Sequence, residues 1–316
     1  MELQWNEAGK KTYETGVSKG VLYPAVSGAY PLGVAWDGLT GVTESPSGAE
    51  AKPMYANNIK WLNLISAESF GATITAFMYP DEFGVLNGEA SVAGGVTIGQ
   101  QSRGVFGLSY ETVLGNDADG KKYGYKIHLV YGAQVAPSEK AYATENDSPE
   151  PINMSWSVST TPVEVSGYDP TATLVIDSTK TDAAKLEILK GILRGTAGAD
   201  ARLPLPAEVI SIVGGSAVSA IALSTSVPAA NATAVAVGAN VVLTFNNKIA
   251  REAVTLVSAL GVLVPTTKTF NAAGKVLTIV PTGNLTASTK YFVTVAGVAD
   301  VYNQSLSTVV NSFTTA

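Results

Sequence analysis

The 316-residue chain contains no cysteine, one histidine and few charged residues. Without cysteine it can form no disulfide, no thiolate metal site and no cysteine nucleophile. The single histidine, His128, shares a strand face with Lys126 in "YKIHLVY", where Tyr125, Ile127, Leu129 and Tyr131 occupy the other face. A polar-facing histidine with no second histidine predicts neither a zinc site nor a catalytic base.

Charged residues make up only 15% of the chain and apolar residues 46%, which excludes disorder and predicts a folded protein. Gly, Thr, Ser and Val are abundant, as is typical of all-β proteins. Long apolar runs are also lacking, because the most apolar region, residues 216–245, is interrupted by Pro228 and Gly238. A membrane span needs about 20 continuous apolar residues. The N-terminus has no basic flank and no apolar core typical of a signal peptide, so we expect a soluble protein without membrane insertion or export.

The net charge of −6 is unevenly distributed. Residues 216–316 contain five Lys and Arg against Glu252 and Asp300, a net of +3, so residues 1–215 carry −9. An acidic domain binds nucleic acid poorly, because that affinity comes from neutralising phosphates with Lys and Arg.

Composition changes at "VGGSAVSA", which predicts two domains, residues 1–215 and residues 216–316. In the first, alternating patterns predict strands over residues 72–80, 105–114, 123–135 and 152–165, with "GNDADGKK" as a hairpin connection. One helix is expected in "TDAAKLEILKGILRG", capped by Thr181 or Asp182 and ended by Gly195. The second domain has the short, closely spaced strands of a small β-sandwich.

Catalytic and binding motifs are weak throughout. "GNDADGKK" resembles a phosphate-binding loop, but Lys122 stands where the magnesium-binding hydroxyl belongs. It also resembles part of a calcium loop, with Lys126 in place of the closing glutamate. The carboxylate pairs Glu44 and Glu50, or Asp81 and Glu82, would suit a glycosidase, but no local feature predicts a raised pKa for any of them. We therefore predict no enzyme, no metal and no cofactor.

A hydroxyl-rich sheet face is the clearest surface feature predicted from the sequence. If Met154, Trp156 and Val158 pack inward with the apolar face of residues 123–135, the opposite face is polar. That face would contain Thr73, Thr75, Lys126, His128, Asn153, Ser155, Ser157 and Ser159. Such a surface suits a wall that lines water. The aromatic residues Trp61, Phe77, Tyr125, Tyr131 and Trp156 are expected in the core instead.

Several blocks between residues 16 and 210 resemble the major tail tube protein of long, non-contractile-tailed bacteriophages. They include "GVAWDGLTGVTESPSGAEAKPMYANNIKWLNLISAESFGATITAFMYPDEF", "TIGQQSRGVFGLSYETVLGND" and "YGYKIHLVYGAQVAPSEKAYATENDSPEPINMSWSVSTTPVEV". "SVPAANATAVAVGANVVLTFNNKI" and "LTIVPTGNLTASTKYFVTVAGVADVYNQSL" resemble a bacterial immunoglobulin-like domain of surface-layer proteins.

The first resemblance implies a mainly β tail-tube sandwich or barrel with one flanking helix, assembled as hexameric rings stacked into a tube. It implies self-association, contacts with the tape measure and other tail proteins, passage of phage DNA without specific binding, and location in the virion tail after synthesis in the host cytoplasm. The candidate lumen face is Thr73, Thr75, Asn153, Ser155 and Ser157. The inter-ring loop is expected to contain Glu44, Pro46, Glu50, Lys52, Pro53 and Tyr55.

The immunoglobulin-like domain is expected to be displayed outward, where it either contacts host-surface glycans or only adds bulk. Two other interpretations stay open. One is a bacterial surface adhesin or binding module, and the other is the inner tube of a contractile injection system, which shares the subunit architecture.

Overall fold

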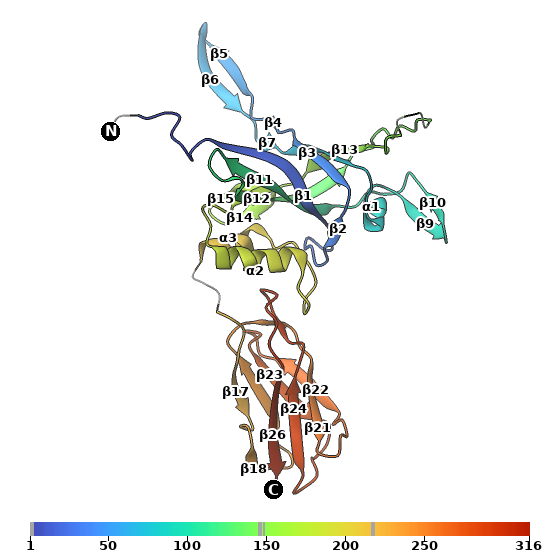
Figure 1. Cartoon of the computed structure of the whole chain (residues 1–316), viewed down its shortest axis with the longest axis vertical. Helices are drawn as coiled ribbons and strands as arrows, with labels where there is room; N and C mark the ends of the chain where they lie inside the picture. The colour runs from blue at the N-terminus through green and yellow to red at the C-terminus, as the bar shows by residue number, and fades with distance from the viewer. Residues whose placement is uncertain (1–2, 145–146, 148, 216–218) are drawn as a thin grey trace. The chain divides into compact units, whose positions relative to one another are not determined.

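The computed structural model describes residues 3–144, 147, 149–215 and 219–316, and it is mainly β, with 50% strand and 9% helix (Figure 1). Its contacts divide the chain into two compact units, Met1–Leu186 with Arg202–Gly214, and Glu187–Ala201 with Gly215–Ala316. We call them the N-terminal and C-terminal units. Ser216, where the second predicted domain begins, lies outside the described residues.

An eight-stranded sheet forms the body of the N-terminal unit, in the order β2-β1-β11-β12-β13-β8-β3, with β16 paired to β12. Its strands are β1 (Thr12–Pro24), β2 (Val34–Trp36), β3 (Leu39–Glu44), β8 (Gly71–Ala76), β11 (Phe106–Asn116), β12 (Gly120–Val135), β13 (Met154–Thr160) and β16 (Thr173–Asp177). The sheet is curled, as a hydrogen bond between two distant strands shows. The Tyr110 hydroxyl on β11 donates to Glu44 Oε1 on β3 (2.8 Å), although β3 is four strands away in the sheet order.

Four two-stranded ribbons extend from this body. They are β4 (Ser47–Gly48) with β7 (Glu68–Ser69), β5 (Ala51–Ala56) with β6 (Ile59–Ile65), β9 (Ala90–Ala93) with β10 (Val96–Ile98), and β14 (Val163–Val165) with β15 (Tyr168–Thr171). Figure 1 shows the β5–β6 hairpin standing away from the sheet.

The core of the N-terminal unit is aromatic. Phe83 lies with its ring centroid 4.5 Å from Trp36 and 5.0 Å from Trp156. Met154, Trp156 and Val158 of β13 point into this core together with Ile74 and Ala76 of β8, as the alternating pattern predicted for β13. The core therefore fills the concave side of the curled sheet, and helix α1 (Asp81–Leu86) contributes Phe83 and Leu86 to it.

The predicted helix is present as α2 (Ala183–Arg194). Asp182 caps it, because its Oδ1 accepts hydrogen bonds from the backbone N–H groups of Ala184 (3.0 Å) and Lys185 (3.2 Å). Gly195 follows with φ +77°, the left-handed conformation that commonly ends a helix. The expectation of one helix was nevertheless wrong, because α1 and α3 (Pro206–Gly214) are also present. Proline is favourable at the first helical position, so Pro206 starts α3 rather than preventing it.

One extra residue in β12 reverses the predicted faces of that strand. Phe106 pairs with Ala133 and Leu108 with Val130, so β12 contains a bulge, and Gly132 in it has φ +60°. A Cβ at Gly132 would lie 2.1 Å from the carbonyl oxygen of Thr161, which only glycine avoids. After the bulge, Val135 pairs with Val158 and faces the aromatic core.

Before the bulge, both faces of β12 are covered. Val130 faces the aromatic core, and His128, two residues earlier, lies on the same face. On the other face the Tyr131 hydroxyl donates a hydrogen bond to Pro204 O, 2.9 Å away. The prediction that Lys126 and His128 extend the serine face was therefore wrong, since they share the core-facing side with Trp156.

The C-terminal unit contains two four-stranded sheets and one two-stranded ribbon. One sheet has the order β17-β19-β23-β22, with β17 (Leu223–Val227), β19 (Val241–Phe245), β23 (Val276–Pro281) and β22 (Thr266–Phe270). The other has the order β18-β26-β24-β21, with β18 (Ala232–Val235), β26 (Val309–Thr315), β24 (Lys290–Val295) and β21 (Val254–Ser258). The ribbon pairs β20 (Ile249–Arg251) with β25 (Ala299–Asp300), and side chains such as Leu243, Leu277, Val293 and Phe313 fill one core, as expected of a small β-sandwich.

Candidate functional site

The segment expected to form a projecting loop is a β-hairpin, which we call the arm (residues 51–65). Ala51 pairs with Ile65 and Ala56 with Ile59, and the turn residues Asn57 and Asn58 have φ values of +51° and +62°. Two successive positive φ angles are typical of the tight turns that join twisted strands, and Asn tolerates them. Lys52, Pro53 and Tyr55 lie on the arm, whereas Pro46 and Glu50 lie on the exposed chain that leads to it.

The arm exposes large apolar side chains on both of its faces. The exposed fraction is 71% for Tyr55, 69% for Trp61 and 68% for Ile65 on one face. On the other face it is 55% for Leu64 and 41% for Met54. From Thr43 to Ser69 not one residue is buried. The expectation that Trp61 and Phe77 belong to the core was therefore wrong, because Trp61 lies on a ribbon with no second layer and Phe77 is 49% exposed just after β8.

Glu44 belongs to a different surface from the arm. It ends β3 and accepts the hydrogen bond from Tyr110, and its Oε1 lies 3.6 Å from His128 Nδ1. It is thus held by its own chain, in a group of polar side chains that we call the Glu14 cluster (Glu14, Glu44, Tyr110, Thr112, Lys126 and His128).

Glu14 forms an ion pair with Lys126 in this cluster. It contacts Lys126 Nζ (2.5 Å), the Thr112 hydroxyl (2.5 Å) and His128 Nε2 (3.3 Å). Burial raises the pKa of Glu14, but the hydrogen bonds from Lys126 and Thr112 lower it more, so the pKa lies below its usual value. Burial, and then the hydrogen bond to Glu44, raises the pKa of Tyr110. These contacts join β1, β3, β11 and β12, so the arrangement serves the body of the fold.

The serine and threonine side chains predicted to share a face do so. Ser155 pairs with Thr75 and Ser157 with Thr73, and directly paired residues lie on the same side of a sheet. Ser155, Ser157 and Asn153 are exposed, Thr73 and Thr75 are half-buried, and the Thr40 hydroxyl donates to Asn153 Oδ1. We call this surface the hydroxyl face. It bears no charged side chain at these five positions, and Ser159 continues it beside Gln134 of β12.

The described residues contain neither a metal-binding cluster nor a serine on a nucleophile elbow. Over residues 3–144, 147, 149–215 and 219–316, no three His, Cys, Asp or Glu side chains gather in a way that could hold a metal ion. A G-x-S-x-G string occurs at residues 16–20, but Ser18 lies within strand β1, not on the strand-to-helix turn that exposes a serine nucleophile. Among the described helices, none has the length and apolar character to cross a membrane.

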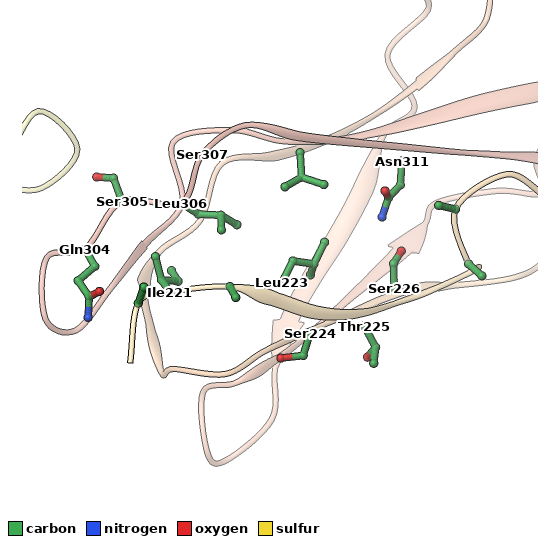
Figure 2. A pocket seen from close by; sticks show the side chains of 15 residues that line it. Ile221, Leu223, Ser224, Thr225, Ser226, Gln304, Ser305, Leu306, Ser307 and Asn311 are labelled. Carbon is green, nitrogen blue, oxygen red and sulfur yellow. The ribbon is translucent and has the colours of Figure 1, made fainter. Parts of the chain in front are cut away.

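The C-terminal unit has a groove of about 850 Å³ between its two sheets (Figure 2). Ile221 and Leu223 lie along one side, and Leu306 and Val309 along the other. Figure 2 shows the strand that carries Leu223 facing the segment that carries Leu306 and Ser307. The groove exists because β18 pairs with β26 only at Phe313 and Thr315, which leaves the beginning of β26 beside open space.

Comparison with known proteins assigns only this unit. Residues 217–315 match the family model described as a bacterial Ig-like domain, so the chain carries such a domain at its C-terminal side. No curated protein matches the chain. Among solved structures, PcoC, a methionine-rich copper resistance protein from Escherichia coli, aligns over 31% of this chain and 100% of its own, with 21% identity and a TM-score of 0.27. CopC from Methylosinus trichosporium OB3b aligns over 30% and 92%, with 20% identity and a TM-score of 0.27. Scores this low carry no argument about function.

Proposed function

We propose that the chain is the structural subunit of a phage tail tube of the long, non-contractile type. Copies assemble as hexameric rings, the rings stack around a lumen through which DNA passes, and the Ig-like domain faces outward. Catalysis, metals and cofactors form no part of this function. The resemblance of residues 16–210 to tail tube proteins is the starting point, and the arm is the structural observation that carries the proposal.

The arm supports self-assembly because its own chain leaves it uncovered. Tyr55, Trp61, Leu64 and Ile65 are each more than half exposed on a narrow ribbon with apolar side chains on both faces. Exposed apolar surface of this kind marks a protein contact. A second copy is the expected partner, since a tube repeats one contact at every subunit and gains the free energy of apolar burial each time.

The hydroxyl face suits the lumen of such a tube. Ser155, Ser157 and Asn153 offer hydrogen bonds to water and no positive charge to phosphate, so DNA would slide past without electrostatic retention. A positive charge on this face would attract phosphate, but Lys126 does not supply one. It lies on the other side of the sheet and pairs with Glu14. The net charge of −9 on residues 1–215 acts in the same direction.

The remaining partners follow from the same assignment. A tail tube subunit contacts the tape measure protein inside the tube and other tail proteins at its ends, and it resides in the virion after synthesis in the host cytoplasm. The match of residues 217–315 to bacterial Ig-like domains favours a second candidate, a surface adhesin in which this domain binds a host glycan. An inner tube of a contractile system would share the subunit and differ by a sheath partner.

Negative-stain electron microscopy of the purified full-length chain tests the proposal. We expect hollow tubes or six-membered rings as the protein concentration rises, with and without tail-tip complexes as seeds. A chain ending at Gly215 should form the same tubes, because the Ig-like domain is not part of the wall. Monomers that persist at high concentration in the presence of seeds would contradict the tube and favour the adhesin.

A further inference from the structure

The groove of the Ig-like domain is lined by uncharged side chains. Its fifteen lining residues are aliphatic, small polar or amide-bearing, and none of them is charged or aromatic. A charged occupant would lose its hydration there without gaining an ionic partner. The groove therefore fits an uncharged, aliphatic occupant that can bury its side chains against Ile221, Leu223 and Leu306.

The same domain carries an uncharged aliphatic protrusion, the loop of residues 259–264 between β21 and β22, which we call the knob. Leu260 is 89% exposed, and Val262 and Leu263 are 62% and 61% exposed. Leu260 is the most exposed of the large hydrophobic residues described in the chain. Nothing in the sequence "ALGVLV" is charged, which matches the lining of the groove.

The knob has a defined conformation. The backbone N–H groups of Gly261 and Val264 donate to Ser258 O (2.9 Å) and Leu256 O (2.8 Å), and Ser258 N–H donates to Val262 O (2.9 Å). Gly261 has φ +77°, which glycine adopts without strain. Since the turn already holds the aliphatic side chains outward, docking would require little further ordering.

Knob and groove lie on opposite sides and at opposite ends of the domain. In the sheet β18-β26-β24-β21, the groove opens on the β18 side and the knob continues β21 at the other edge. Val309 at the groove pairs with Val295, whose other partner Val254 begins β21, whereas Ser258 ends that strand next to the knob. One domain therefore cannot insert its own knob into its own groove.

We propose that the knob of one copy inserts into the groove of the Ig-like domain of the next copy. The contact is heterologous, so it continues from copy to copy and does not close into a dimer. It rests on the proposed function, because stacked rings would present these domains at regular intervals. Under this proposal the partner of the groove is a second copy of the chain rather than a glycan.

Site-directed cross-linking of the full-length chain tests this contact without background, since the sequence has no cysteine. Ala259→Cys next to the knob and Ser307→Cys at the groove are combined in one chain, which leaves the aliphatic side chains of the knob intact. A short bis-maleimide is added to the assembled protein, and the products are separated by denaturing gel electrophoresis. We expect a ladder of dimers, trimers and longer species, and we expect Leu260→Ser with Leu263→Ser in the same chain to lower its yield at least tenfold.

Two matched controls accompany the test. Phe270→Ser removes another exposed apolar side chain of the same domain and should leave the ladder unchanged. Moving the second cysteine from the groove to exposed Thr269 should abolish the ladder. Absence of the ladder overturns the inference, and so does a ladder that persists in the Leu260→Ser, Leu263→Ser variant, since another segment then fills the groove. Micrographs of the same samples report tubes separately, so tubes without a ladder would leave the proposed function standing.

Discussion

Polar substitution of the arm should separate assembly from folding. Trp61 and Ile65 lie on one face of the arm and keep 69% and 68% of their surface exposed in the isolated chain. Complete burial of such a side chain contributes about 1.5–3 kcal/mol, so covering the remaining two thirds would contribute about 1–2 kcal/mol for each. Replacing both with serine should therefore weaken each arm contact by about 2–4 kcal/mol, or about 30- to 700-fold.

The free energy of unfolding of the monomer should hardly change, because neither side chain is buried in its own chain. Substitutions at such exposed positions usually alter stability by less than about 0.5 kcal/mol. Assembly is measured as the protein concentration at which material first sediments, and monomer stability as the urea midpoint below that concentration. Asn63→Ser, a polar substitution on the same face of the arm, is the matched control and should leave both quantities unchanged.

Equal sedimentation of the control and of Trp61→Ser, Ile65→Ser would refute the reasoning, since the arm would then bury nothing on assembly. A large fall in the urea midpoint of the double variant would refute it in another way. That result would mean that the arm packs against its own chain in solution, and the exposed apolar surface would be no evidence for a partner.

Two further predictions concern the N-terminal unit. Asp182→Ala removes the acceptor for the N–H groups of Ala184 and Lys185 and should lower the free energy of unfolding by about 1 kcal/mol. Asp182→Asn keeps an acceptor and should lower it by only about a few tenths of a kcal/mol. Identical urea midpoints for the wild type and both variants would exclude a capping role. The pKa of Glu14 lies below its usual 4.5, so its ionised form is favoured by folding, and its contribution to stability is present above pH 4.5 and lost as the pH falls through the folded value. Glu14→Gln should destabilise the protein at neutral pH and progressively less in acid, and an effect that does not vary with pH would contradict this assignment.

Local signals in the sequence were sufficient for several elements of the fold. The hairpin of β11 and β12, the capped helix α2 and the inward side chains of β13 each depend on residues close together in the chain. The hydroxyl face was predictable for the same reason, because alternation in two paired strands assigns Ser155 and Thr75 to one side.

Other features depend on residues far apart or on a count that alternation does not provide. The bulge at Gly132 adds one residue, and that residue moved Lys126 and His128 to the opposite side from the one predicted. Glu44 could not be assigned to the Glu14 cluster because its partner Tyr110 is 66 residues away. Trp61 follows a strand pattern correctly, but a pattern cannot show whether a second layer covers the strand.

The bulge in β12 also determines which changes this strand tolerates. Loss of one residue between Val130 and Ala133 would leave two residues of β12 opposite two of β11, as in a regular pair of strands. Gln134 would then stay on the side of Ser159 and Val135 in the aromatic core. A side chain at Gly132 is a different matter, because its Cβ would lie 2.1 Å from the carbonyl oxygen of Thr161. This short stretch should therefore tolerate the removal of its extra residue better than it tolerates a side chain at Gly132.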